Sequence, residues 1–560
     1  MLSPTEKELC ASLSGPQLFD DTKTIASFNR LSGSQGEAGA LDFIENQLQA
    51  TGVPFQRYYF PAILSTPQEA HFSYVDAQGE KRNVPCKTWS FTPSTAPQGI
   101  TAPLRLMAPQ ALEHHPLTFW AERNPSENKK DLEGIIVVSR TSNPVAIMDA
   151  ERRGAIAFVI LWSQGDEELI HEGNVNMVWG TPEPEQTGMY TSIPVIVLSK
   201  PVSDTLASTL QKETLQGTIY TNVLQAVTNI PVLEAVISSD TESPYYLLVG
   251  SHLDSWHYGA SDNATGNAIA LALAETFAKL RGKKFGLRIC WWSGHSNGRY
   301  AGSSAFASRN FISLNRHCLA YSNIDMPGMR GASNFSRITV GSDLMNWGAS
   351  VIEDLTGQKG VWGAHVRGWD QSFQNIGISP YLIWSSTLPK GSPYTTSNSF
   401  MSWWWHTEKD LPQYTDSSIL KQDGQIYLLA LSRILCASSF SYNIRALIET
   451  ITARLDQPLF KAFKKQDEAK SITQELQRIQ KTLRDPLSLE KQLSYIRNLN
   501  RILYAFKAPE LQDWAINLDY IPGLSLALSS SPQTSRGHII VRHFMENQLN
   551  RIILLLQQLQ

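Results

Sequence analysis

The sequence predicts an α/β protein: a mixed, largely parallel sheet flanked by helices, interrupted by a β-rich insert and followed by a helical C-terminal region. Three observations predict this fold class. Strand-like and helix-like runs alternate over residues 245–324, further β-like runs lie between residues 134 and 198, and long helical patterns dominate after about residue 430. At 560 residues, the chain is long enough for two to four structural units.

The N-terminal residues 1–92 are expected to form the first part of the central domain. A helical pattern over residues 21–53 is broken at 31–34 and resumes at 37–49, and Gly52 is a suitable helix C-terminal stop. A strand is predicted at 55–60. The composition then turns to Ser, Thr, Pro and Gly over about 92–103, which indicates a domain boundary.

Residues 93–228 are expected to form the inserted unit. Strands are predicted at 134–139, 155–161 and 193–198, with a helix at 144–153 between the first two. This pattern resembles the protease-associated domain. An α/β insert of another kind remains the alternative.

Residues 229–430 are expected to form the central domain. Strands at 245–250, 287–292 and 319–324 are separated by helices at 263–280 and 303–313, which predicts parallel pairing with helices on the faces of the sheet. Functional sites in such folds lie at the carboxyl ends of the strands.

Residues 431–560 are expected to form a helical domain. Its final amphipathic run, 539–559, is either a homodimer face or packs on its own domain.

Composition restricts the partners. Apolar residues make up 42% and charged residues 18% of the chain, and the net charge of -3 does not favour nucleic acid or anionic lipid. The five cysteines are widely spaced without a CxxC pair, and neither a secretion signal nor a membrane-spanning run is recognised. We therefore expect a cytoplasmic protein without nucleic-acid or membrane partners.

Polar residues cluster at four predicted strand ends, where imidazole and carboxylate groups are suited to bind zinc or a related divalent ion. Asp254 follows His252 closely and is placed to orient its ring. The candidate metal ligands, in chain order, are His252, Asp262, Asp325 and His406.

These motifs make residues 240–420 resemble the catalytic domain of the zinc aminopeptidase and glutamate carboxypeptidase family, which includes the transferrin receptor as a non-catalytic relative. The resemblance implies a zinc-exopeptidase-like fold in which His252 and Asp325 bind one metal, Asp262 bridges two, and His406 binds the second. Asp370, within residues 368–373, resembles the substrate-loop motif S-D-H-x-x-F of that family.

One departure from the family affects the residues that would carry out the reaction. Family members carry two adjacent glutamates, a general base and a metal ligand, where this sequence has His295 and Ser296. Three arrangements remain open: one metal with His295 as base and His406 assisting the carbonyl oxygen, two metals with His295 as substitute ligand, or a site without activity.

The resulting hypothesis is a metal-dependent hydrolase of peptide or small amide bonds. It would bind one or two divalent ions, with zinc as the metal we expect first. Arg299 is a candidate for binding a substrate carboxylate, and Trp369 for an aromatic pocket wall that favours apolar or cyclic side chains. The opposing hypothesis is an inactive, peptidase-like binding or scaffold protein. The sequence does not distinguish an exopeptidase from a small-amide hydrolase.

Overall fold

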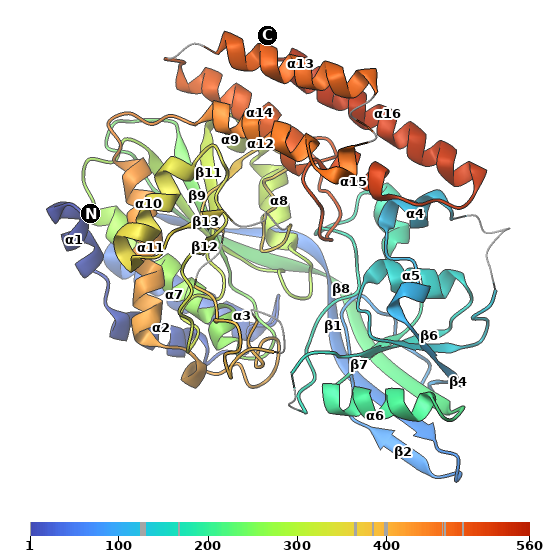
Figure 1. The fold of residues 1–560 in the computed structure, drawn as a ribbon. Coiled ribbons are helices and arrows are strands. Elements are labelled where there is room, and N and C mark those ends of the chain that lie inside the picture. Colours follow the sequence, from blue (N-terminus) through green and yellow to red (C-terminus); the bar gives the residue numbers. More distant parts are fainter. Residues whose placement is uncertain are drawn as a thin grey trace.

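One sheet of twelve strands runs through the part of the chain that the computed structural model describes, and it joins two lobes (Figure 1). The described residues are 2–559 without 124–129, 166–167, 363–366, 384–385, 397–400, 462, 464–465 and 484–485. The strand order is β14-β11-β9-β10-β8-β4-β5-β6-β7-β3, and β1 pairs with both β8 and β2. The strands are β1 (Phe55–Val75), β2 (Lys81–Val84), β3 (Lys87–Thr88), β4 (Ile100–Met107), β5 (Ile136–Ser139), β6 (Ala157–Leu161), β7 (Val195–Leu198), β8 (Gln216–Ile237), β9 (Tyr246–His252), β10 (Gly286–Trp292), β11 (Cys318–Asn323) and β14 (Ser379–Pro380).

The first lobe has parallel strands at its centre. β10, β9, β11 and β14 pair in parallel, and β8 and β1 add antiparallel strands on the β10 side. The predicted strands at 245–250, 287–292 and 319–324 are β9, β10 and β11. The predicted mixed, largely parallel sheet is confirmed.

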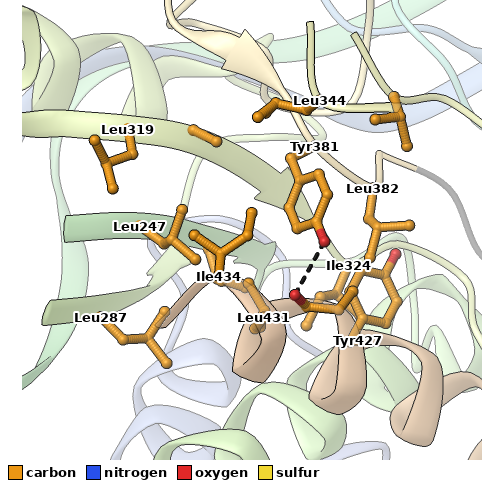
Figure 2. Packing of buried hydrophobic residues seen from close by; sticks show 14 of the residues in the cluster. Leu247, Leu287, Leu319, Ile324, Leu344, Tyr381, Leu382, Tyr427, Leu431 and Ile434 are labelled. Carbon is orange, nitrogen blue, oxygen red and sulfur yellow. Dashed lines mark hydrogen bonds between the residues drawn. The ribbon is translucent and has the colours of Figure 1, made fainter. Parts of the chain in front are cut away.

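Helices cover both faces of this part of the sheet. Leu247, Leu287 and Leu319 lie on neighbouring strands and face Leu431 and Ile434 of α11 (Figure 2). α2, α3 and α7 belong to the same core, and α8 and α9 pack on the opposite face. Burying each of these leucine side chains stabilises the fold by about 1.5–3 kcal/mol relative to leaving it exposed. This packing holds β9, β10 and β11 in place.

The helices that the structure describes surround the two lobes (Figure 1). No helix within the described residues is both long enough and apolar enough to cross a membrane. The helices are α1 (Pro4–Ala11), α2 (Gly15–Ile25), α3 (Gln35–Thr51), α4 (Pro116–Ala121), α5 (Pro144–Arg152), α6 (Lys200–Leu210), α7 (Thr265–Lys279), α8 (Ala301–Arg309), α9 (Phe311–His317), α10 (Met345–Thr356), α11 (Ser417–Leu435), α12 (Ile444–Leu455), α13 (Asp467–Thr482), α14 (Leu489–Tyr504), α15 (Pro522–Ser529) and α16 (Ser535–Gln557).

The long strands β1 and β8 form an antiparallel ribbon that passes from the first lobe into the second (Figure 1). β8 pairs with β10 near its C-terminal end and with β4 near its N-terminal end. The outer part of β1 therefore reaches the second lobe before residue 93, where the insert was predicted to begin. The boundaries at 93 and 228 stay predictions.

The second lobe has its own α/β layers. β4, β5, β6 and β7 are parallel, and β3 pairs antiparallel with β7. The strands predicted at 134–139, 155–161 and 193–198 correspond to β5, β6 and β7, and the predicted helix between them is α5. Separate apolar clusters pack on the two faces of this part of the sheet.

The C-terminal helices lie across both lobes (Figure 1). The last helix, α16, contacts α4 of the second lobe and α13, α14 and α15 of its own region. Its apolar side chains Leu549, Ile552 and Leu556 are buried in these contacts. This is the arrangement in which the final amphipathic run packs on its own chain.

Candidate functional site

His252 stands at the carboxyl end of β9 with a fixed ring orientation. Its Nδ1 donates to the main-chain carbonyl of Asp254 at 2.8 Å, so in the neutral ring the lone pair is on Nε2. That nitrogen lies 2.9 Å from Asp262 Oδ1 and 3.4 Å from Asp325 Oδ1. The sheet thus brings three of the four predicted metal ligands together.

The fourth predicted ligand, His406, approaches Asp262 from the other side. Its Nε2 lies 3.2 Å from Asp262 Oδ2, and its Nδ1 donates to the main-chain carbonyl of Glu172 at 2.9 Å. Glu172 belongs to the second lobe. Asp262 therefore offers one oxygen to each imidazole, which is the geometry of a bridging carboxylate.

These groups fit a divalent cation. Within the described residues, His252 Nε2 and Asp325 Oδ1 are buried without a hydrogen-bond partner. Two ligands of one zinc ion, each 2.0–2.2 Å from it, are roughly 3.3 Å apart, close to the separations found between His252 and the two carboxylates. Burial alone would lower the pKa of His252, but the carboxylates of Asp325 and Asp262 raise it well above its usual value. The cluster thus favours positive charge between its members.

His295 lies beside this cluster, close enough to His252 and Asp325 for the three to hold one ion, but the orientation of its ring disfavours this. The two rings are stacked, with centroids 3.8 Å apart and planes 11° from parallel. A metal bound by an imidazole lies near the ring plane, and two parallel planes do not share such a point. A potential ligand atom of His295 is nevertheless within 4.8 Å of those of His252 and Asp325, so it is close enough to act on a molecule bound there.

Asp254 acts on the turn that carries His295. Its carboxylate accepts hydrogen bonds from the main-chain nitrogens of His295 at 3.1 Å and Ser296 at 2.8 Å, and from the Ser32 hydroxyl at 2.6 Å. The His252 ring is oriented by the carbonyl of Asp254, not by the carboxylate. Asp254 thus holds the main chain of the turn that carries His295 and Ser296.

Asp370 lies behind His295 and not on the cavity wall where a substrate contact was predicted. It is fully buried, and its Oδ2 is 2.6 Å from Nδ1 of His295. Its other oxygen accepts a hydrogen bond from Ser303. Neither oxygen is free for a substrate, because burial and these two partners occupy both.

The metal-ligand cluster opens into a cavity of about 310 Å³ whose wall includes Asp262, Asp325 and His406. Arg299 and Trp369 also line it, as predicted for substrate-binding residues. Arg299 donates to the carbonyl of Ala515 at 2.7 Å, while its buried Nε has no hydrogen-bond partner among the described residues. Arg299 and Trp369 also line a larger neighbouring cavity of about 770 Å³.

The sequence did not single out the cavity residues that come from the second lobe. Trp89, Trp162 and Glu172 line the same cavity, although they lie at least 80 residues before the first metal ligand in the sequence. No local motif marks them. The only available signal was the unusual number of tryptophans, 15 in all.

Residues 233–431 match the sequence model of peptidase family M28. A probable glutamate carboxypeptidase, LAMP1 of Arabidopsis thaliana, is 30% identical over 94 residues, which cover 16% of this chain and 14% of that protein. Aminopeptidase NAALADL1 of Mus musculus is 25% identical over 199 residues, 34% of this chain and 26% of that protein. The alignments thus span about a quarter or less of these relatives.

Solved structures share the fold. A peptidase M28 precursor from Shewanella amazonensis superposes with a TM-score of 0.61 at 18% identity, covering 78% of this chain and 97% of that one. BSAP, a zinc aminopeptidase from Bacillus subtilis, superposes with a TM-score of 0.55 at 16% identity, covering 76% and 97%.

Proposed function

We propose, from the match of residues 233–431 to the sequence model of peptidase family M28, that the chain is a metal-dependent hydrolase of peptide or small amide bonds. The observation that carries the proposal is the buried cluster of two imidazoles and two carboxylates beside a cavity. Burying these groups together without a cation is costly, because each loses its hydration and the carboxylates repel one another.

His252, Asp262 and Asp325 would hold one ion, with zinc as the metal best suited to this mixture of nitrogen and oxygen ligands. A second position has two protein ligands, Asp262 and His406, because Ser296 stands where the family resemblance implies a glutamate. The stacking of His295 on His252 supports a role as base over a role as ligand of the first ion. We therefore favour one firmly bound ion and a weak second position.

A divalent ion in this place supplies Lewis acidity, which polarises a carbonyl group and makes water a stronger acid. Nε2 of His295 accepts the proton of the attacking water and returns it to the leaving amine. His406 lies on the opposite side of Asp262, and it would assist the carbonyl oxygen only as an imidazolium, because its Nδ1 proton is used by the carbonyl of Glu172.

The cavity wall supports a substrate with an apolar or cyclic side chain. The tryptophans on this wall offer large, rigid apolar faces; they are Trp89, Trp162, Trp256, Trp369 and Trp405. Arg299 also lines this cavity, and its guanidinium is our candidate for binding a substrate carboxylate.

Two broader predictions remain proposals. A cytoplasmic location rests on the five cysteines, none of which forms a disulfide bond in the structure. A homodimer through the C-terminal helices has less support, since the apolar side of α16 packs on its own chain.

Metal analysis combined with a substrate panel tests the proposed function. Purified chain is analysed by plasma emission spectroscopy and then assayed on free-amino peptides, C-terminal glutamyl peptides and N-acyl amino acids. We expect bound zinc and turnover of at least one class, with both lost in Asp325→Ala. A metal-free protein that hydrolyses none of them would overturn the proposal and favour the scaffold hypothesis.

A further inference from the structure

We propose that Asp370 is a positioning residue that holds the imidazole of His295 in the one tautomer able to act as a base. The inference rests on the proposed function and deepens it. It starts from the 2.6 Å contact between Asp370 Oδ2 and His295 Nδ1, which lies beneath the cavity and is shielded from water because Asp370 is fully buried.

The carboxylate of Asp370 is itself held in place. Ser303 donates to its Oδ1 at 2.6 Å, and the Ser303 hydroxyl lies 2.8 Å from that of Ser372. Trp179 Nε1 donates to the Ser372 hydroxyl at 2.7 Å, so the Ser372 proton is free to reach Ser303. This chain of donors leaves Asp370 Oδ2 for His295.

The His295 ring is fixed on its other sides as well. Its main-chain nitrogen donates to Asp254, one face stacks on His252, and the edge of Tyr300 meets it with ring centroids 4.9 Å apart and planes at 85°. With Nδ1 on Asp370, Nε2 is directed away from the buried carboxylate. His295 itself is part of the cavity wall beside Asp262 and Asp325.

An imidazole needs such a partner, whereas the glutamate implied by the family resemblance does not. A carboxylate base accepts a proton at either oxygen without rearrangement. A neutral imidazole has two tautomers, and only the one with its proton on Nδ1 leaves Nε2 able to accept. A carboxylate is an acceptor only, so Asp370 selects that tautomer.

The proton balance is simple. The oxygen of the attacking water bonds to the carbonyl carbon as one O–H bond breaks, and the proton bonds to Nε2 of His295; that proton then moves to the nitrogen of the leaving amine as the C–N bond breaks. Asp370 gains no proton in either step. Its negative charge stabilises the imidazolium that exists between them, as the aspartate of a Ser-His-Asp triad does.

The principal variant is Asp370→Asn, with Asp343→Asn as its matched control, because Asp343 is also a buried aspartate with a serine donor, Ser379. Asparagine offers one acceptor and one donor group, so His295 or Ser303 must face an NH2 group. We expect Asp370→Asn to lower kcat about 10²–10⁴-fold with KM and zinc content little changed. Asp343→Asn makes the same exchange at an aspartate that contacts neither His295 nor the Ser303 network, and its kcat is expected to stay within about threefold of wild type.

A double-mutant cycle separates positioning from a general structural effect. If Asp370 acts through His295, Asp370→Asn adds little further loss in a His295→Gln background. The same large loss in both backgrounds would overturn the proposal, as would wild-type kcat in Asp370→Asn.

A spectroscopic measurement tests the contact independently of turnover. A proton between Nδ1 and a buried carboxylate gives a strongly deshielded ¹H NMR resonance. We expect this resonance in wild type and Asp343→Asn, and its loss in His295→Gln and in Asp370→Asn. If wild type neither binds zinc nor hydrolyses any substrate, the proposed function fails. A resonance that is absent from wild type, or that survives in His295→Gln, overturns the Asp370 assignment itself.

Discussion

Asp410 holds the main chain at Asp262, a proposed metal ligand, and replacing Asp410 by asparagine is expected to weaken metal binding. The Asp410 carboxylate is buried and accepts three hydrogen bonds. They come from the main-chain nitrogens of Ser261 and Asp262, both at 2.9 Å, and from the Ser261 hydroxyl at 2.7 Å. Asparagine keeps the shape but turns an NH2 group towards one of these donors.

The expected magnitude follows from the number of donors affected. One buried N–H group left without an acceptor costs about 1–3 kcal/mol of folding free energy. Loss of a group that orients a metal ligand typically lowers metal affinity about 10–100-fold, which corresponds to roughly 1.4–2.7 kcal/mol. Asp410→Asn is therefore expected to reduce both stability and zinc affinity.

Asp513→Asn is the matched control. Asp513 is also a buried carboxylate with three donors, the main-chain nitrogens of Phe506 and Lys507 and the side-chain amide of Asn375, but it does not contact a metal ligand. Zinc affinity is measured by competition with a chelator, and the free energy of unfolding by urea titration. We expect both variants to lose stability and only Asp410→Asn to lose zinc affinity. Equal zinc affinity in the two variants would refute the reasoning.

Three further predictions address the site and its supports. Ser296→Glu adds a carboxylate near the second metal position and should raise the zinc content towards two ions per chain; an unchanged ratio by plasma emission spectroscopy would contradict this. Arg30→Met removes a buried guanidinium that donates five hydrogen bonds to main-chain carbonyls, and should lower the free energy of unfolding in urea by about 3–5 kcal/mol; a loss under about 1 kcal/mol would refute it. Burial lowers the pKa of His171 to about 4 in the folded protein. In the unfolded chain the pKa of this histidine is about 6.5, so between pH 4 and pH 6.5 the unfolded chain binds more protons than the folded one. Wild type should therefore lose about 3 kcal/mol of stability as the pH falls from 6.5 to 4, and His171→Gln should lose that much less over the same range.

Local patterns were sufficient to predict the central sheet. The apolar runs that became β9, β10 and β11 are short and buried except at Arg288 of β10, and each is followed by a polar turn, so the sequence marked both their positions and the ends that carry the candidate site. The ribbon of β1 and β8 was less visible. Only residues 55–60 of β1 were predicted as a strand, because its outer half alternates irregularly between buried and exposed positions and contains Pro67.

The site was predictable where each residue follows a strand. His252 and Asp325 end or follow adjacent parallel strands, which explains why spacing in the sequence translated into proximity. The partner of His295 was not predictable in this way. Asp370 lies 75 residues further along the chain, and the resemblance that drew attention to it implied a substrate contact. Only tertiary structure reveals that its carboxylate faces an imidazole.

The shared ribbon makes the second lobe an integral part of the fold and not an exchangeable module. A designer who excised this lobe would cut through β1 and β8, which also complete the sheet beside β10. The same cut would remove the Glu172 carbonyl that fixes the tautomer of His406. Specificity in this architecture is therefore better altered by changing side chains on the cavity wall than by swapping whole lobes between relatives.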